Sequence, residues 1–106
     1  MILILKHKWF DMIASGEKKE EYRLNTSRMA KMVANWTFKH GFGKRVIDFR
    51  RGYTKTSCKV RCNGIHSVSV HNIGNHEYCL LKPEWGYVKG KPLIVFELGE
   101  ADTVML

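Results

Sequence analysis

Four consecutive apolar residues near the end of the chain, Leu93-Ile94-Val95-Phe96, constrain the fold most. Successive side chains of a strand point to opposite faces of a sheet, so this run is apolar on both faces. Such a strand is stable only where both faces are covered. We therefore expect Pro92–Leu98 to be a central strand. The tail Glu100–Leu106 is expected to fray.

Shorter patterns precede this strand in the order strand, helix, strand, helix, then several strands. The helices are indicated by apolar residues at helical spacing, with Gly16 at the end of the first and N-cap residues before the second. The predicted elements are a strand Ile2–Lys6, a helix Trp9–Ala14, a strand ending near Arg23, a helix Met29–Trp36 and a strand Lys44–Arg51.

The segment 58–70 is predicted to be a β-hairpin. A three-residue loop, Asn63-Gly64-Ile65, would pair Cys62 with His66 and collect the apolar residues, Cys58 among them, on one buried face. A two-residue Asn-Gly loop would mix the two faces, so the longer loop is preferred.

These elements predict the α+β class, with a curled sheet or small barrel in a single domain, 1–106. The 106 residues suit one domain that buries a core. No apolar run approaches the ~18–20 residues of a membrane span. The apolar segment Met1–Leu5 lacks a basic stretch before it, so we expect no signal peptide, no membrane anchor and a cytoplasmic protein with three free cysteines.

The charge balance favours polyanionic partners. Eighteen Lys and Arg residues face ten Asp and Glu residues, which gives a net charge of +8 and a pI near 9.6. A compact domain this basic favours nucleic acid first and an anionic membrane surface second. On the second helix Arg28, Lys31, Asn35 and Lys39 form a basic stripe, either a solvated face or a contact for phosphates.

Cysteines and histidines gather between residues 58 and 79 without the paired spacing of a structural zinc site. They are Cys58, Cys62, His66, His71, His76 and Cys79. We expect no metal and no cofactor, and neither a phosphate-binding glycine loop nor a nucleophile elbow is present in the sequence.

The densest polar motif is Gly16-x-Lys18-x-x-Glu21-x-Arg23. A carboxylate beside a lysine and an arginine is held ionised and rigid, which is how a small protein builds a polar site. Strand alternation puts Glu21 and Arg23 on one face and Lys18 on the other, so the three converge only if the stretch twists, bulges or begins as a turn at Gly16.

Aromatic residues near cations are candidates for stacking on bases. Tyr53 and Tyr87 lie beside glycine turns, and Trp85 belongs to the same aromatic cluster as Tyr87. Arg50 and Arg51 lie close to Tyr53 in sequence. Trp36 falls on the apolar side of its helix and is expected in the core.

The motif, placed after a strand and a short helix, resembles the signature of the ASCH domain, a relative of the PUA domain. Further landmarks are Trp36, Gly52-Tyr53, Pro83–Gly86 and Ile94–Glu100, whereas 37–80 align only loosely. The resemblance implies a PUA-like β-barrel of about five to six strands with two main helices. It also implies a cleft, lined by the motif, that binds RNA or a nucleotide-like ligand.

The resemblance leaves an enzymatic alternative open, because some relatives hydrolyse N4-acetylcytidine and others are ribonucleases. The amidohydrolases use a motif lysine, a threonine three residues on and a distant glutamate. Lys18 matches the lysine, Glu21 stands in place of the threonine, and the glutamate would be Glu77 or Glu84. In an enzyme Lys18 and Glu21 would be the catalytic pair. In a binding module the residues in contact with the ligand would be Lys18, Glu21, Arg23, Tyr53, Trp85, Arg50 and Arg51.

Overall fold

A computed structural model describes residues 1–41, 45–68, 82–86 and 90–105, with backbone positions only for 102–105. The elements are β1 (Ile2–Leu5), α1 (His7–Ala14), β2 (Glu20–Leu24), α2 (Ser27–Lys39), β3 (Val46–Arg51), β4 (Ser57–Val68), the 3-10 turn η3 (Pro83–Trp85) and β5 (Leu93–Met105). This is the predicted α+β class.

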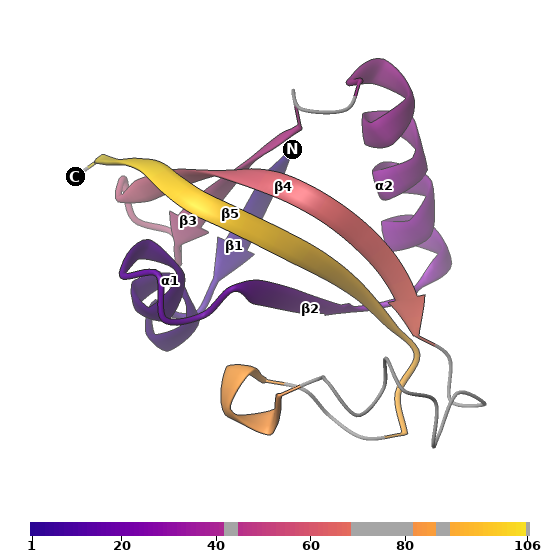
Figure 1. Cartoon of the computed structure of the whole chain (residues 1–106), viewed down its shortest axis with the longest axis horizontal. Coiled ribbons are helices and arrows are strands. Elements are labelled where there is room, and N and C mark those ends of the chain that lie inside the picture. Colours follow the sequence, from indigo (N-terminus) through magenta and orange to yellow (C-terminus); the bar gives the residue numbers. More distant parts are fainter. Residues whose placement is uncertain (42–44, 69–81, 87–89, 106) are drawn as a thin grey trace.

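The strands form one sheet in the order β1-β3-β4-β5-β2, in which β1 and β3 are parallel and the other pairs antiparallel. The long strands β4 and β5 curve together, with β2 beside β5 (Figure 1). The sheet is therefore a curled half-barrel whose two edge strands are β1 and β2. Helix α1 lies at one end of it, and α2 rises along the opposite flank (Figure 1).

The predicted central strand is confirmed. Leu93, Ile94, Val95 and Phe96 are all buried, and β5 lies between β4 and β2. The concave side of the sheet and the two helices share one core, to which α2 contributes Trp36. The prediction that Trp36 is a core residue is therefore confirmed. Among the described helices, none combines the length and the apolar character required to cross a membrane.

The predicted hairpin at 58–70 is wrong, because residues 57–68 form the single strand β4, paired with β5. The register shifts between Cys62 and Gly64, so Asn63 and Gly64 belong to an irregularity in the strand. A Cβ on Gly64 would lie 2.6 Å from Glu97 Oε2, so this glycine permits a close approach of the Glu97 side chain. Cys58 and Cys62 are nevertheless buried, as expected.

The expectation that the tail frays is also wrong for its backbone. Strand β5 continues to Met105, which pairs with Ser57 of β4. The ladder hydrogen bonds of a partner strand hold this end of the chain.

Candidate functional site

A tight turn after α1 brings Lys18 to the start of β2. Gly16 has φ +84, a left-handed conformation that glycine adopts without steric cost, and the Lys18 amide donates to the Met12 carbonyl at 2.9 Å. The strand begins only at Glu20, so alternation along the strand does not set the direction of Lys18. Of the three geometries that allow convergence, the chain uses the turn at Gly16.

Lys18, Glu21 and Arg23 meet in one ion cluster. Lys18 Nζ lies 2.7 Å from Glu21 Oε1, and Arg23 Nε lies 2.9 Å from Glu21 Oε2. Arg23 Nη2 also donates to the Ile4 carbonyl of β1 at 2.8 Å. The cluster therefore bridges the two edge strands of the half-barrel, with one carboxylate between two cations.

Burial makes this cluster unlike a surface ion pair. Lys18 is 2% exposed and Glu21 is 3% exposed. A buried charge needs partners for its remaining polar capacity, since desolvation costs several kcal/mol per ion. The Lys18 ammonium also lies 4.6 Å from the ring centroid of Trp9 and 5.9 Å from that of Tyr22, which adds cation–π attraction.

The cluster lies at the wall of a cavity of about 620 Å³, here called the β2 cavity. Aromatic side chains line it from three elements: Trp9 of α1, Tyr22 of β2 and Trp85 of η3. The remaining lining residues are Ile4, Leu5, Lys6, Lys18, Glu21, Arg23, Leu24, Thr26, Met29 and Gly86. The volume is in the range of small-molecule sites, and apolar walls with a few converging polar groups are typical of them.

Hydrogen bonds from β2 hold the turn that carries Trp85. The Lys82 amide donates to Tyr22 Oη at 3.1 Å, and Tyr22 Oη donates to Glu20 Oε1 at 2.7 Å. Partial burial, together with the hydrogen bond to Glu20, raises the pKa of the Tyr22 phenol, so it stays protonated as a donor. Gly86, with φ +98, lies so close to the Trp9 ring that a Cβ would stand 3.3 Å from it.

A second hollow of about 550 Å³ lies on another side of Lys18. Small residues and backbone line most of it, together with Lys19 and Glu100. Lys18 thus borders both hollows, while the aromatic walls belong to the β2 cavity alone.

The other predicted site residues lie elsewhere. Tyr53 is 95% exposed and shares a hollow of about 280 Å³ with Arg50, away from Lys18. Arg50 Nη2 contacts Asp48 Oδ2 at 2.9 Å, and Arg51 Nε contacts Asp11 Oδ1 at 2.9 Å. Trp85 is therefore the predicted stacking residue that the structure brings to the Lys18 cluster, and Tyr53, Arg50 and Arg51 are not brought there.

Trp9 is the site residue that the sequence reasoning missed. Its helical spacing assigned it to the apolar face of α1, yet it is only half-buried and contacts the ammonium groups of Lys18 and Lys8. It lies about two helical turns before Gly16, and its approach to Lys18 depends on how α1 packs beside β2, which no local pattern encodes.

Within the described residues, no group of three or more histidine, cysteine or acidic side chains is placed to hold a metal ion. Several predicted candidates lie outside the described residues: His71, His76, Cys79, the glutamate candidate Glu77 and the stacking candidate Tyr87. The other glutamate candidate, Glu84, is exposed on η3 and is absent from the lining of the β2 cavity.

Sheet, helices and buried ion cluster together define the class: a small α+β half-barrel domain with a polar site between its edge strands. No protein-family model matches the sequence, and no curated protein matches it significantly. The structure is similar to the crystal structure of a serine-to-alanine mutant of ZmASCH from Zymomonas mobilis. The TM-score is 0.58 at 13% identity, over 98% of this chain and 71% of that chain. The chain therefore has the ASCH-type, PUA-like fold that its motif predicted.

Proposed function

We propose that the β2 cavity binds RNA or a nucleotide-like ligand. The observation that carries the proposal is the buried cluster of Lys18, Glu21 and Arg23 at the wall of an aromatic cavity of about 620 Å³. Two cations share one carboxylate, so the cluster keeps a formal charge of +1, which favours an anionic or acceptor-rich ligand.

The remaining hydrogen-bond donors define how such a ligand is held. An ammonium has three donors and a guanidinium five. Lys18 uses one on Glu21, and Arg23 uses its Nε and one Nη2 hydrogen on Glu21 and Ile4. The spare donors serve phosphate oxygens or base carbonyls, and the ring of Trp85 stacks on the base, as aromatic residues do in recognition of unpaired RNA.

The geometry favours binding over the enzymatic alternative. Both oxygens of Glu21 already accept hydrogen bonds, one from Lys18 and one from Arg23. A general base needs a free lone pair within reach of the proton that it removes. Each oxygen keeps a second lone pair, but Glu21 is 3% exposed and fixed between Lys18 and Arg23, so we assign it the role of ordering the two cations.

A cytoplasmic location is part of the same proposal. Cys62 has a free thiol, which suits a reducing compartment.

The test is a titration of labelled single-stranded RNA of about 12 nucleotides, and separately of cytidine monophosphate, against matched variants. Arg23→Gln removes one cation of the cluster, the Arg23 side chain, which is 24% exposed. Arg50→Gln is the matched control, because it removes an arginine outside the cavity. We expect Arg23→Gln to weaken both ligands about tenfold or more and Arg50→Gln to match wild type. Equal binding by Arg23→Gln and wild type would place the ligand elsewhere.

Incubation with N4-acetylcytidine separates binding from catalysis. The proposal predicts binding of the nucleoside without release of acetate. Turnover that is lost in Glu21→Gln would instead establish the enzymatic alternative.

A further inference from the structure

The outer face of α2 carries three cations and no acidic residue. The outer face consists of five residues that lie on one side of the helix, at spacings of three, four, three and one residues: Arg28, Lys31, Asn35, Phe38 and Lys39. All five are exposed, and the 13 residues of α2 include no Asp or Glu.

Only Lys39, in the last turn of α2, has a charge that the helix dipole favours. The first turn of α2 contains Arg28 and no acidic residue, although the positive end of the helix dipole disfavours a cation there. Arg28 and Lys31 are like charges at i and i+3, which repel. Within the described part of the chain, no salt bridge joins Arg28, Lys31 or Lys39 to a carboxylate. The positive charge is therefore available to an external partner.

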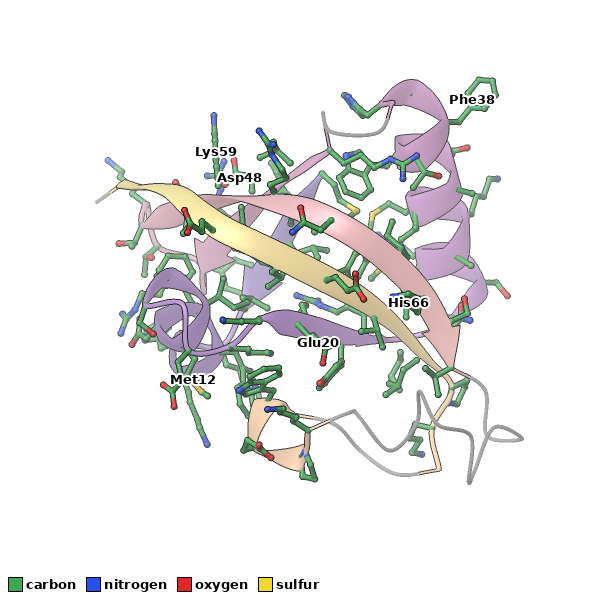
Figure 2. The ribbon with its side chains drawn as sticks, in the orientation of Figure 1. Met12, Glu20, Phe38, Asp48, Lys59 and His66 are labelled. Carbon is green, nitrogen blue, oxygen red and sulfur yellow. The ribbon has the colours of Figure 1, made fainter. Side chains whose placement is uncertain are left out.

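An aromatic ring stands among these cations. Phe38 is 93% exposed, and Figure 2 shows it projecting from the end of α2 away from the sheet. Lys39 follows it directly, and Lys31 lies two turns earlier on the same side. An exposed ring between cations is the arrangement with which proteins hold single-stranded nucleic acid, whose bases stack while its phosphates meet the cations.

The outer face begins where the β2 cavity ends. Thr26, the N-cap of α2, and Met29, in its first turn, line the cavity, and Arg28 lies between them in the chain. From Arg28 to Lys39 the helix rises about 16 Å at 1.5 Å per residue. A strand that leaves the cavity can follow this face without crossing an acidic side chain of α2.

We propose that the outer face of α2 is an interaction surface for the backbone of single-stranded RNA that continues from the β2 cavity. Arg28, Lys31 and Lys39 contact phosphates, and Phe38 stacks on a base. At about 3.4 Å per stacked nucleotide, the face accommodates about five nucleotides. This inference rests on the proposed function and deepens it, because it makes the ligand a strand rather than an isolated nucleotide.

An anionic membrane fits this face less well. A helix that lies in a membrane interface inserts a broad apolar face beneath its basic face. In α2 that apolar side, with Val33 and Trp36, is already buried in the protein core. On its exposed side α2 offers two large apolar side chains to a membrane, Phe38 and Met32, which is too small an apolar face to insert.

The test compares two triple variants that remove equal charge. Arg28→Gln/Lys31→Gln/Lys39→Gln changes the outer face, and Lys55→Gln/Lys59→Gln/Arg61→Gln removes three exposed cations from β4 and the turn before it. Removal of three phosphate contacts should weaken binding of a labelled RNA of about 12 nucleotides by about 100-fold at 0.1 M salt. It should also reduce the slope of log K against log[salt] by about 2. The control variant should match wild type within about twofold, because salt screens distant charges.

Two further measurements isolate the surface from the cavity and from the fold. Cytidine monophosphate should bind the outer-face variant as it binds wild type, and Phe38→Ser alone should weaken RNA about tenfold. The outer-face variant should melt close to wild type, because loss of Arg28 from the first turn of α2 relieves the helix dipole while loss of Lys39 from the last turn removes a favourable charge.

The outcomes are distinguishable. If wild type binds RNA and the outer-face variant binds it equally, the surface proposal is overturned while the cavity proposal stands. If wild type binds neither RNA nor cytidine monophosphate, both fail. Binding to phosphatidylserine vesicles that is lost in the outer-face variant, with RNA binding unaffected, would overturn this proposal in favour of a membrane surface.

Discussion

Replacement of Lys18 by methionine tests whether the buried ion cluster behaves as the structure implies. The substitution keeps the length of the side chain and removes its charge. Glu21, 3% exposed, would then keep Arg23 as its ion-pair partner, and the cation–π contact of Lys18 with Trp9 would be lost. Removal of one partner of a buried ion pair costs about 3–5 kcal/mol. Arg23 stays on Glu21 Oε2, but Oε1 loses its ammonium and stays in the interior, so we expect a cost toward the lower end of that range.

That cost is a large part of the free energy of unfolding of such a domain, which is about 5–15 kcal/mol. With an m-value of about 2 kcal/mol/M, the urea midpoint of Lys18→Met should fall by about 2 M. The double variant Lys18→Met/Glu21→Met removes both buried charges and leaves Arg23 bonded to the Ile4 carbonyl. It should regain most of the loss, with a coupling free energy of about 2–3 kcal/mol in the double-mutant cycle.

The assay is urea unfolding followed by circular dichroism and tryptophan fluorescence for wild type, both single variants and the double variant. A loss below about 1 kcal/mol for Lys18→Met, with additive effects in the double variant, would refute the reasoning. The pair would then be as weak as an exposed salt bridge, and the cluster would not be a rigid site.

Further predictions concern residues around the site and the core. Gly86→Ala puts a Cβ at φ +98 beside the Trp9 ring, so we expect a loss of about 1 kcal/mol or more in unfolding free energy and altered tryptophan fluorescence; unchanged fluorescence would argue against that contact. Burial is the largest cause that raises the pKa of the Cys62 thiol in the folded protein. The stability linked to the Cys62 thiol is therefore fully present below the pKa of this thiol in the unfolded chain, and it is lost as pH rises through its pKa in the folded protein. Its reaction with a thiol reagent at neutral pH should be slow in native protein and fast in urea. The hydrogen bond from Arg51 lowers the pKa of Asp11, so Arg51→Gln should raise that pKa toward its ordinary value in an NMR titration. That pair stabilises the fold above the unfolded pKa of Asp11, an effect lost as pH falls through the folded pKa; an unchanged titration would show that the pair does not form in solution.

The periodicity of apolar residues correctly predicted the elements whose buried sides depend on the sequence of that element alone. The run Leu93–Phe96 required cover on both faces and is buried between two neighbouring strands. The helical spacing of Met29 to Trp36 found α2, although the helix starts two residues earlier and ends three later. In both cases the apolar pattern alone indicates what is buried: both faces of the strand and one side of the helix.

The sequence-based predictions failed where a strand pairs with another strand far away in the sequence. Asn63-Gly64 is a strong hairpin signal in sequence, but β5 offers β4 a partner along its whole length. Gly64 serves the approach of the Glu97 carboxylate instead of a turn. The same long pairing holds the end of β5 that was expected to fray.

The candidate site was predictable in its chemistry and less so in its geometry. The motif supplied Lys18, Glu21 and Arg23, and the one open question was the direction of Lys18. The left-handed turn at Gly16 and the hydrogen bond to Met12 decide it. The contribution of Trp9 depended on how α1 packs beside β2 and η3, which no local pattern encodes.

The most direct test of the central claim is an NMR titration that follows the three indole N–H signals and the Arg23 Nε–H signal as short RNA is added. Trp9 and Trp85 line the β2 cavity, whereas Trp36 lies in the core and serves as an internal control. We predict that the signals of Trp9, Trp85 and Arg23 shift together and saturate, while that of Trp36 does not move. Saturable shifts confined to the backbone around Tyr53 and Arg50, with Trp9 and Trp85 unchanged, would contradict the account.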